Sequence, residues 1–169
     1  MYNYNSLDIE VYVNDKIRSI GKGSLIRFDD SLYFITCFHC INKSKANKFI
    51  IKSNSIEVLD ITNQYYKSFC DLDLAIFVIS NKLTSDISID LSEINVIDLE
   101  DKPYNINGYE QGYFFNKVIE YLELTYHDFM NLDLINHIAI KGEMDETTIG
   151  FSGSIIYSEK KDCIGMLCG

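Results

Sequence analysis

Short runs of hydrophobic residues, many of them alternating with polar residues, recur along the whole chain. Each run is bounded by clusters of Asn, Asp, Gly, Ser or Lys. Because successive side chains of a strand point to opposite faces of a sheet, short bounded runs of this kind predict β-strands. The predicted strands are residues 9–13, 23–28, 32–36, 48–51, 55–61, 74–79, 105–109, 117–125, 133–140, 154–157 and 163–167.

Helices are expected at only two places, residues 40–47 and 127–131, and both stretches are short. A parallel sheet needs crossover helices of about 10 to 15 residues between its strands, so the pattern predicts an all-β sandwich or barrel. A polar stretch rich in Ser and Asp separates two strand-rich halves. We therefore predict two subdomains, residues 1–83 and 96–169, joined by a linker at residues 84–95.

The composition agrees with a strand-rich globular protein and shows a strong acidic excess. Aromatic residues make up 13 % of the chain, with 12 Tyr and 10 Phe, and such residues favour strands. Lys and Arg number 15 against 25 Asp and Glu, which gives a formal net charge of −10. Binding to a phosphate backbone normally needs a basic patch, so the composition argues against nucleic acid as a partner.

The N-terminal residues show neither the basic start nor the uninterrupted apolar run of a secretion signal. No stretch approaches the roughly 18 apolar residues of a membrane-spanning helix, so no membrane partner is expected. The five cysteines are an odd number without regular spacing, which is typical of reduced thiols in a reducing compartment. Together these features predict a cytoplasmic protein.

Motifs for cofactors and metals are missing from the sequence. Cys37 and Cys40 have CxxC spacing, but no second pair follows at the distance of a zinc finger, so we interpret them as small core residues. His127 and His137 have no Glu or Cys around them at metal-ligand spacing. HExxH, P-loop and GxGxxG sequences do not occur. We therefore expect no metal and no cofactor.

Three residues with catalytic chemistry each lie at the edge of a different predicted strand. His39 ends one hydrophobic run, Asp73 opens another, and Ser152 lies between glycines in GFSG. Singly, each has an ordinary structural explanation: a hydrogen-bonded histidine, a solvated turn aspartate and a common glycine-containing turn. Jointly they indicate nucleophilic catalysis, because an attacking serine needs a base and the base needs an acceptor that fixes its tautomer. Asp71 is the alternative acid.

The segments around these residues resemble, in order and over nearly the whole chain, those of the trypsin-like (chymotrypsin-fold) serine proteases. GKGSLI at 21–26 is similar to the family's Gly-Gly-Ser-Leu-Ile strand, and YFITCFHC at 33–40 is similar to its Val-Leu-Thr-Ala-Ala-His-Cys. Further segments that resemble the family are DLAIF at 73–77, NINGYEQG at 105–112, GFSGSII at 150–156 and IGMLCG at 164–169. The resemblance implies a chymotrypsin-like double β-barrel with the active site in the cleft between the barrels.

The resemblance also implies a role for each matching residue. Ser152 would attack the scissile carbonyl, His39 would act as general base and then general acid, and Asp73 would orient the imidazolium. Asp73 is favoured over Asp71 because it directly precedes Leu-Ala-Ile, as in the family. The backbone N–H groups of Gly150 and Ser152 would form the oxyanion hole.

Several further residues are implied in substrate binding. Glu146, six positions before the nucleophile, would line the bottom of the primary pocket and favour Lys or Arg in the substrate. Thr147 and Thr148 would equally suit a small or polar pocket. Gly153 would let the substrate backbone pass close, and Cys168 lies in the segment similar to the strand that walls this pocket.

The chain departs from the family pattern at three places. Phe151 stands where activated animal members carry an Asp that pairs with a new N-terminal amine. The oxyanion loop is therefore either formed constitutively or arranged by another device. The usual disulfide partner of Cys40 is replaced by Lys22 or a neighbour, which agrees with reduced thiols. Family members normally add one more strand and a C-terminal helix, which implies a second barrel left incomplete at Gly169 and a longer parent protein.

We therefore expect a serine endopeptidase whose substrate is a protein or peptide. Bacterial members without a signal peptide resemble effector modules of antiphage defence, which implies a sensor or regulatory domain, or a partner protein that the enzyme cleaves. The alternative is a catalytically silent protease-like module for binding or sensing, which Phe151 favours and the intact catalytic set argues against. A cysteine hydrolase using Cys37 or Cys168 is disfavoured, because neither cysteine lies in the glycine-flanked loop.

Overall fold

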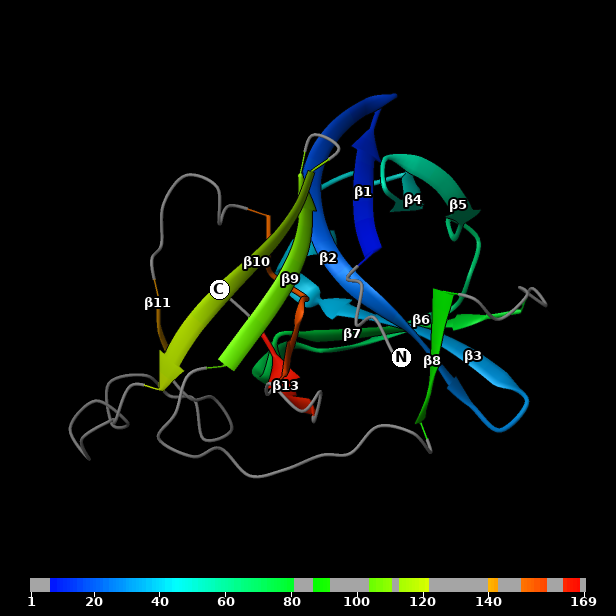
Figure 1. Ribbon diagram of the computed structural model, residues 1–169. Coiled ribbons are helices and arrows are strands. Elements are labelled where there is room, and N and C mark those ends of the chain that lie inside the picture. Colours follow the sequence, from blue (N-terminus) through cyan, green and yellow to red (C-terminus); the bar gives the residue numbers. More distant parts are fainter. Residues whose placement is uncertain are drawn as a thin grey trace.

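The chain forms two β-sheets, antiparallel among the described residues except for one short parallel pair (Figure 1). The computed structural model describes residues 7–80, 87–91, 104–110, 113–121, 140–142, 150–157 and 163–167. Helical structure within these ranges consists of one turn of α-helix and one 3₁₀ turn, with single 3₁₀ positions at residues 87 and 91. The prediction of an all-β fold is therefore confirmed.

The first sheet is built from the N-terminal strands of the chain. They are β1 (Leu7–Val13), β2 (Lys16–Phe28), β3 (Ser31–Cys37), β4 (Lys48–Ser53), β5 (Ile56–Asp60), β6 (Tyr66–Phe69), β7 (Leu74–Ile79) and β8 (Ser88–Asp90). They pair in the order β5-β4-β1-β2-β3-β7-β6, and β8 lies parallel to β2. Asn14 and Asp15 join β1 to β2 with φ angles of 50° and 61°. Asn and Asp tolerate this left-handed conformation, which suits the twist of a tight hairpin.

The hydrophobic core of the first sheet follows from the alternation along its strands. Three alternate residues of β1 are at most 2 % exposed, namely Leu7, Ile9 and Val11. They share one face because side chains alternate along a strand. Phe77 of β7 is fully buried, and its ring centroid lies 4.8 to 6.4 Å from those of Tyr66, Phe49 and Phe34. This aromatic group packs β3 and β7 against β4 and β6.

The second sheet is built from the C-terminal strands. They are β9 (Tyr104–Glu110), β10 (Tyr113–Tyr121), β11 (Ile140–Gly142), β12 (Ile155–Tyr157) and β13 (Cys163–Met166), paired in the order β11-β10-β9-β12-β13. The β9–β10 hairpin is its longest part, drawn in green and yellow-green in Figure 1. Ile155 at the start of β12 packs with Ile26 and Ile89 of the first sheet. The residues directly before β12 are thereby brought against the first sheet.

Two predicted elements differ from the structure. The helix predicted at residues 40–47 is instead the single turn α1 (Phe38–Ile41), which ends where Asn42 leaves the helical region with a ψ of 71°. Strand β8 falls inside the predicted linker 84–95, so this part of the linker pairs with β2. The division into two subdomains itself stays a prediction.

Two other predicted elements lie largely beyond the described ranges. The helix predicted at residues 127–131 is wholly outside them. Of the strand predicted at residues 133–140, only Ile140 is described, and it begins β11.

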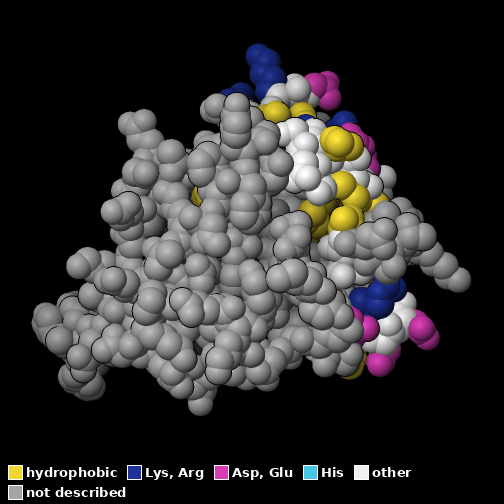
Figure 2. Space-filling view, viewed as in Figure 1, with side chains coloured by type: hydrophobic (Ala, Val, Ile, Leu, Met, Phe, Trp, Pro, Cys, Tyr) yellow, Lys and Arg dark blue, Asp and Glu magenta, His cyan; other side chains and the backbone are white. Residues whose placement is uncertain are grey.

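The described part of the surface mixes hydrophobic and charged side chains. Figure 2 shows hydrophobic side chains next to acidic and basic ones on the described part of one face. Large hydrophobic residues that are about half exposed or more include Ile20 and Ile56, at 50 % and 71 %. Within the part of the chain that the structure describes, no helix has the length and apolar character needed to cross a membrane.

Candidate active site

His39 and Asp73 lie at neighbouring ends of two paired strands. In the antiparallel ladder of β3 and β7, Cys37 lies opposite Leu74. His39 follows β3 as the second residue of α1, and Asp73 directly precedes β7, after the 3₁₀ turn η1 (Cys70–Leu72). Antiparallel pairing therefore places the two residues side by side, although 34 positions separate them in the sequence.

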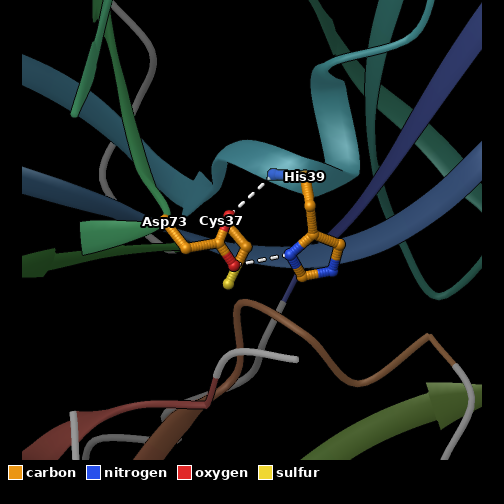
Figure 3. A group of neighbouring side chains, drawn as sticks. All are labelled: Cys37, His39 and Asp73. Atoms are coloured by element: carbon orange, nitrogen blue, oxygen red, sulfur yellow. Dashed lines mark hydrogen bonds and ion pairs between the residues drawn. The ribbon is translucent and has the colours of Figure 1, made fainter. Parts of the chain in front are cut away.

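Two hydrogen bonds join Asp73 to His39, as Figure 3 shows. His39 Nδ1 lies 2.6 Å from Asp73 Oδ2, and the backbone N–H of His39 donates to Asp73 Oδ1 at 2.8 Å. The Asp73 backbone has a left-handed φ of 48°, and its carbonyl accepts from the Phe38 N–H at 2.9 Å. An ionised carboxylate only accepts, so Nδ1 carries the imidazole proton and Nε2 is left as the basic nitrogen.

Asp73 is thus the acid that contacts His39. The alternative acid, Asp71, lies within η1, and its side chain is outside the described part of the structure. The preference for Asp73 came from the residues that follow it, and those residues form β7.

Ser152 lies in a turn between two glycines with positive φ angles, +91° at Gly150 and +97° at Gly153. The Ser152 carbonyl accepts from the Lys22 N–H of β2 at 2.7 Å. The Gly153 N–H donates to the Leu167 carbonyl at 2.7 Å, which ties the turn to the end of the second sheet. In Figure 3 the orange-brown segment 150–157 passes below the imidazole of His39. The turn is therefore fixed from both sheets.

Cys40 connects the histidine to this turn. Its Sγ lies 3.5 Å from His39 Nε2 and 3.7 Å from the Ser152 carbonyl oxygen. The predicted nucleophile and the predicted base therefore share one buried neighbour. The hydrogen bond with Cys37, and less strongly the nearby His39, lower the pKa of the Cys40 thiol despite its burial.

Two amides of the turn around Ser152 have no backbone acceptor among the described residues. Neither the Gly150 N–H nor the Ser152 N–H donates to a backbone carbonyl among the described residues. The neighbouring amides of Gly153 and Ser154, in contrast, donate to Leu167 and Phe151. Two amides without a backbone acceptor in the described part of the chain, in a turn with glycine at a positive φ, fit the geometry that a developing oxyanion needs.

Three groups that could ligate a metal lie together at this site. One donor atom each from Cys37, His39 and Asp73 lie within 4.8 Å of one another (Figure 3). Thiolate, imidazole and carboxylate are zinc-ligand types. Here, however, His39 Nδ1 is hydrogen-bonded to Asp73 Oδ2, and Cys37 Sγ donates to the Leu167 carbonyl at 3.2 Å. A metal would have to displace these hydrogen bonds, so we assign none.

Gly153 offers a direct test of the turn geometry. A Cβ at this position would fall inside the contact distance of the Lys22 carbonyl oxygen, and the φ of +97° is strained for any other residue. Gly153→Ala is therefore expected to destabilise the protein by about 1–3 kcal/mol from backbone strain alone. The measurement is the free energy of unfolding in denaturant. Gly165→Ala is the matched control, since its Cβ would meet nothing within 4 Å, and an equal loss in both variants would contradict the prediction.

The structure describes only part of the predicted site. His39, Asp73, Ser152 and Gly150 lie in described segments, as does Gly153. The remaining predicted pocket residues are outside these segments: Glu146, Thr147, Thr148 and Cys168. Their roles in specificity stay predictions.

Sequence reasoning missed two residues that contact the turn. Cys40 was interpreted only as a small core residue; it is buried, but it also contacts His39 and Ser152. Lys22 was noted only as a missing cysteine. Its signal is the one charged residue inside GKGSLI, a segment whose six residues are all buried. A buried lysine needs a partner, which marks it as a residue with a specific contact.

No protein-family model matches the sequence, and no curated protein matches it significantly. Solved structures match in fold. The NSP4 proteinase from equine arteritis virus matches with a TM-score of 0.56 at 13 % identity, over 100 % of this chain and 68 % of that one. The serine endoprotease from Yersinia pestis matches with a TM-score of 0.64 at 17 % identity, over 95 % of this chain and 52 % of that one. The tobacco vein mottling virus protease matches with a TM-score of 0.58 at 12 % identity, over 98 % of this chain and 73 % of that one.

These structural matches cover nearly the whole of this chain. Their sequence identities are low, so they show a common fold only. The chain spans about half the length of the Yersinia pestis endoprotease. Together with the two sheets and their topology, they identify the fold as that of the chymotrypsin-like serine proteases. The fold that the sequence resemblance implied is therefore confirmed.

Proposed function

We propose that this chain is a serine endopeptidase that hydrolyses peptide bonds in protein substrates. The observation that carries the proposal is the hydrogen-bonded His39–Asp73 pair, which shares the neighbour Cys40 with the glycine-flanked turn of Ser152. A structural histidine has no need of a carboxylate on Nδ1 together with a serine turn that shares a neighbour with its Nε2. Nucleophilic catalysis needs both the carboxylate and the serine.

In the proposed mechanism, Ser152 Oγ attacks the scissile carbonyl carbon while His39 Nε2 accepts the hydroxyl proton. Asp73 stabilises the resulting imidazolium through the 2.6 Å contact of Oδ2 with Nδ1. The amides of Gly150 and Ser152 donate to the oxyanion of the tetrahedral intermediate. His39 then gives its proton to the leaving amine, and water hydrolyses the acyl-enzyme by the same steps.

The proposal extends to finer points that the sequence resemblance implied. Glu146 would favour Lys or Arg before the cut bond, while Thr147 would support a small or polar pocket instead. We further propose a cytoplasmic enzyme that cleaves a partner protein, as the protease module of a longer defence protein. A library of fluorogenic peptides with varied residues before the cut bond distinguishes the two pockets.

Labelling with a fluorophosphonate probe tests the proposed nucleophile. The probe forms a covalent bond only with an activated serine, so the wild-type protein is expected to gain the mass of one adduct and Ser152→Ala none. Intact-protein mass spectrometry is the readout. Ser154→Ala is the matched control, because Ser154 lies in the same turn but is fully buried, and it should label like the wild type.

The outcomes separate the two functions considered. An adduct that persists in Ser152→Ala would assign the reactive group elsewhere. A wild-type protein that stays unlabelled while correctly folded would contradict the endopeptidase and favour the silent binding module.

A further inference from the structure

Phe151, next to the predicted nucleophile, is almost completely buried, with 1 % of its surface exposed. Its ring faces the ammonium group of Lys22, whose Nζ lies 5.7 Å from the ring centroid. This distance is within the range of about 6 Å over which a cation is attracted to an aromatic face. The aromatic residue that replaces the family's Asp therefore has a cationic partner inside the protein.

Lys22 is itself buried and held in place by Asp8. The two residues lie opposite each other in the β1–β2 ladder, and Lys22 Nζ donates to Asp8 Oδ1. Burial is the largest influence on the Asp8 carboxyl and raises its pKa, although the contact with Lys22 opposes this effect. Lys22 is buried and the Asp8 side chain is 16 % exposed, so solvent screens their attraction less than it would at the surface.

The main chain of Lys22 fixes the same turn from the other side. Its N–H donates to the Ser152 carbonyl at 2.7 Å. Its own carbonyl accepts from Thr36 Oγ1 at 2.6 Å and lies where a side chain on Gly153 would have to go. One residue of β2 therefore contacts three consecutive residues of the turn, Phe151, Ser152 and Gly153.

We propose that Lys22, held by Asp8, is the positioning residue that fixes the nucleophile turn in its reactive conformation. Its main chain sets the position of Ser152, and its ammonium group holds the Phe151 ring through the cation–π contact. The amides of Gly150 and Ser152 then point to a common site. The turn is then formed in the folded chain with no cleavage to create a new N-terminus. This inference rests on the proposed function of Ser152.

A purely structural role for the pair would be to stabilise β1 and β2. A second ion pair on β1 provides the comparison, because Lys52 Nζ lies 2.8 Å from Glu10 Oε2. Lys52 belongs to β4, on the side of β1 away from β2. Lys52 also lies opposite Asp8 in the β1–β4 ladder, but its influence on the Asp8 carboxyl is weaker than that of Lys22. Lys52→Met therefore removes an ion pair from the same strand and leaves Lys22 in place.

The experiment measures the second-order rate constant of fluorophosphonate labelling, well below the melting temperature of every variant. Lys22→Met is expected to label about 100-fold more slowly, the loss typical of a misplaced reacting group. Asp8→Leu/Lys22→Met should show the same loss, and it leaves no buried charge unpaired. Lys52→Met should keep the wild-type rate.

Wild-type labelling rates in both Lys22 variants, with only the melting temperature lowered, would overturn the positioning role. The double variant keeps this test valid if Lys22→Met alone does not fold. A wild-type protein that does not label overturns the proposed function instead. Because the wild type is measured first, the two failures are distinguishable.

Discussion

Replacing Asp73 by Asn is expected to slow the labelling of Ser152 by about 10⁴-fold while the protein stays folded. The carboxylate holds His39 with the proton on Nδ1, through a contact of 2.6 Å. The amide of Asn offers an N–H to the same nitrogen and so favours the other tautomer, in which Nε2 carries the proton and cannot accept one. The measurement is the rate of fluorophosphonate labelling across pH, with circular dichroism as the check on folding.

Asp60→Asn is the matched control for this variant. This variant also removes one negative charge from the first sheet. Asp60 is the last residue of β5, and its carboxylate accepts from the Thr62 N–H. Its labelling rate should equal that of the wild type. If Asp73→Asn labelled as fast as Asp60→Asn, the proposed role of Asp73 would be wrong.

Phe77→Ala is expected to lower the free energy of unfolding by about 3–5 kcal/mol. The ring of Phe77 is fully buried, and three other aromatic rings pack around it. Removing it leaves a cavity that these rigid neighbours fill only in part. Chemical denaturation followed by fluorescence or circular dichroism gives the value.

Phe28→Ala serves as the comparison, because Phe28 is 51 % exposed. It should change the free energy of unfolding by no more than about 0.5 kcal/mol. Similar losses in the two variants would contradict the assignment of Phe77 to the centre of the core.

Strands with a strong hydrophobic run could be predicted from the sequence. Residues 74–79 were predicted as a strand and form β7 with the same bounds. β6 was missed because Tyr-Lys-Ser-Phe carries no hydrophobic run, and it is a strand only because it pairs with β7. Similarly, β2 begins at Lys16 rather than at residue 23, since the tight turn at Asn14 pairs its polar half with β1.

The site could be predicted only as far as local signals reach. His39 and Asp73 lie at the ends of hydrophobic runs, and Ser152 lies between glycines. Each residue can therefore be recognised from the sequence of its own segment. The contacts of Lys22 with Phe151 and Ser152 join segments far apart in the chain, and no local pattern specifies them. Burial of Lys22 depends on Asp8 across the ladder, which requires the register of β1 and β2.

The tie between Cys37 and Leu167, 130 positions apart, has a consequence for how the protein is made. A nascent chain that has emerged through β7 already carries His39 and Asp73, but it has no Ser152. The turn is anchored on Leu167 only when the last described residues have left the ribosome. N-terminal segments fold first during synthesis. On the proposed function, proteolytic activity therefore requires synthesis through Leu167, and a chain that has emerged only through β7 is inactive.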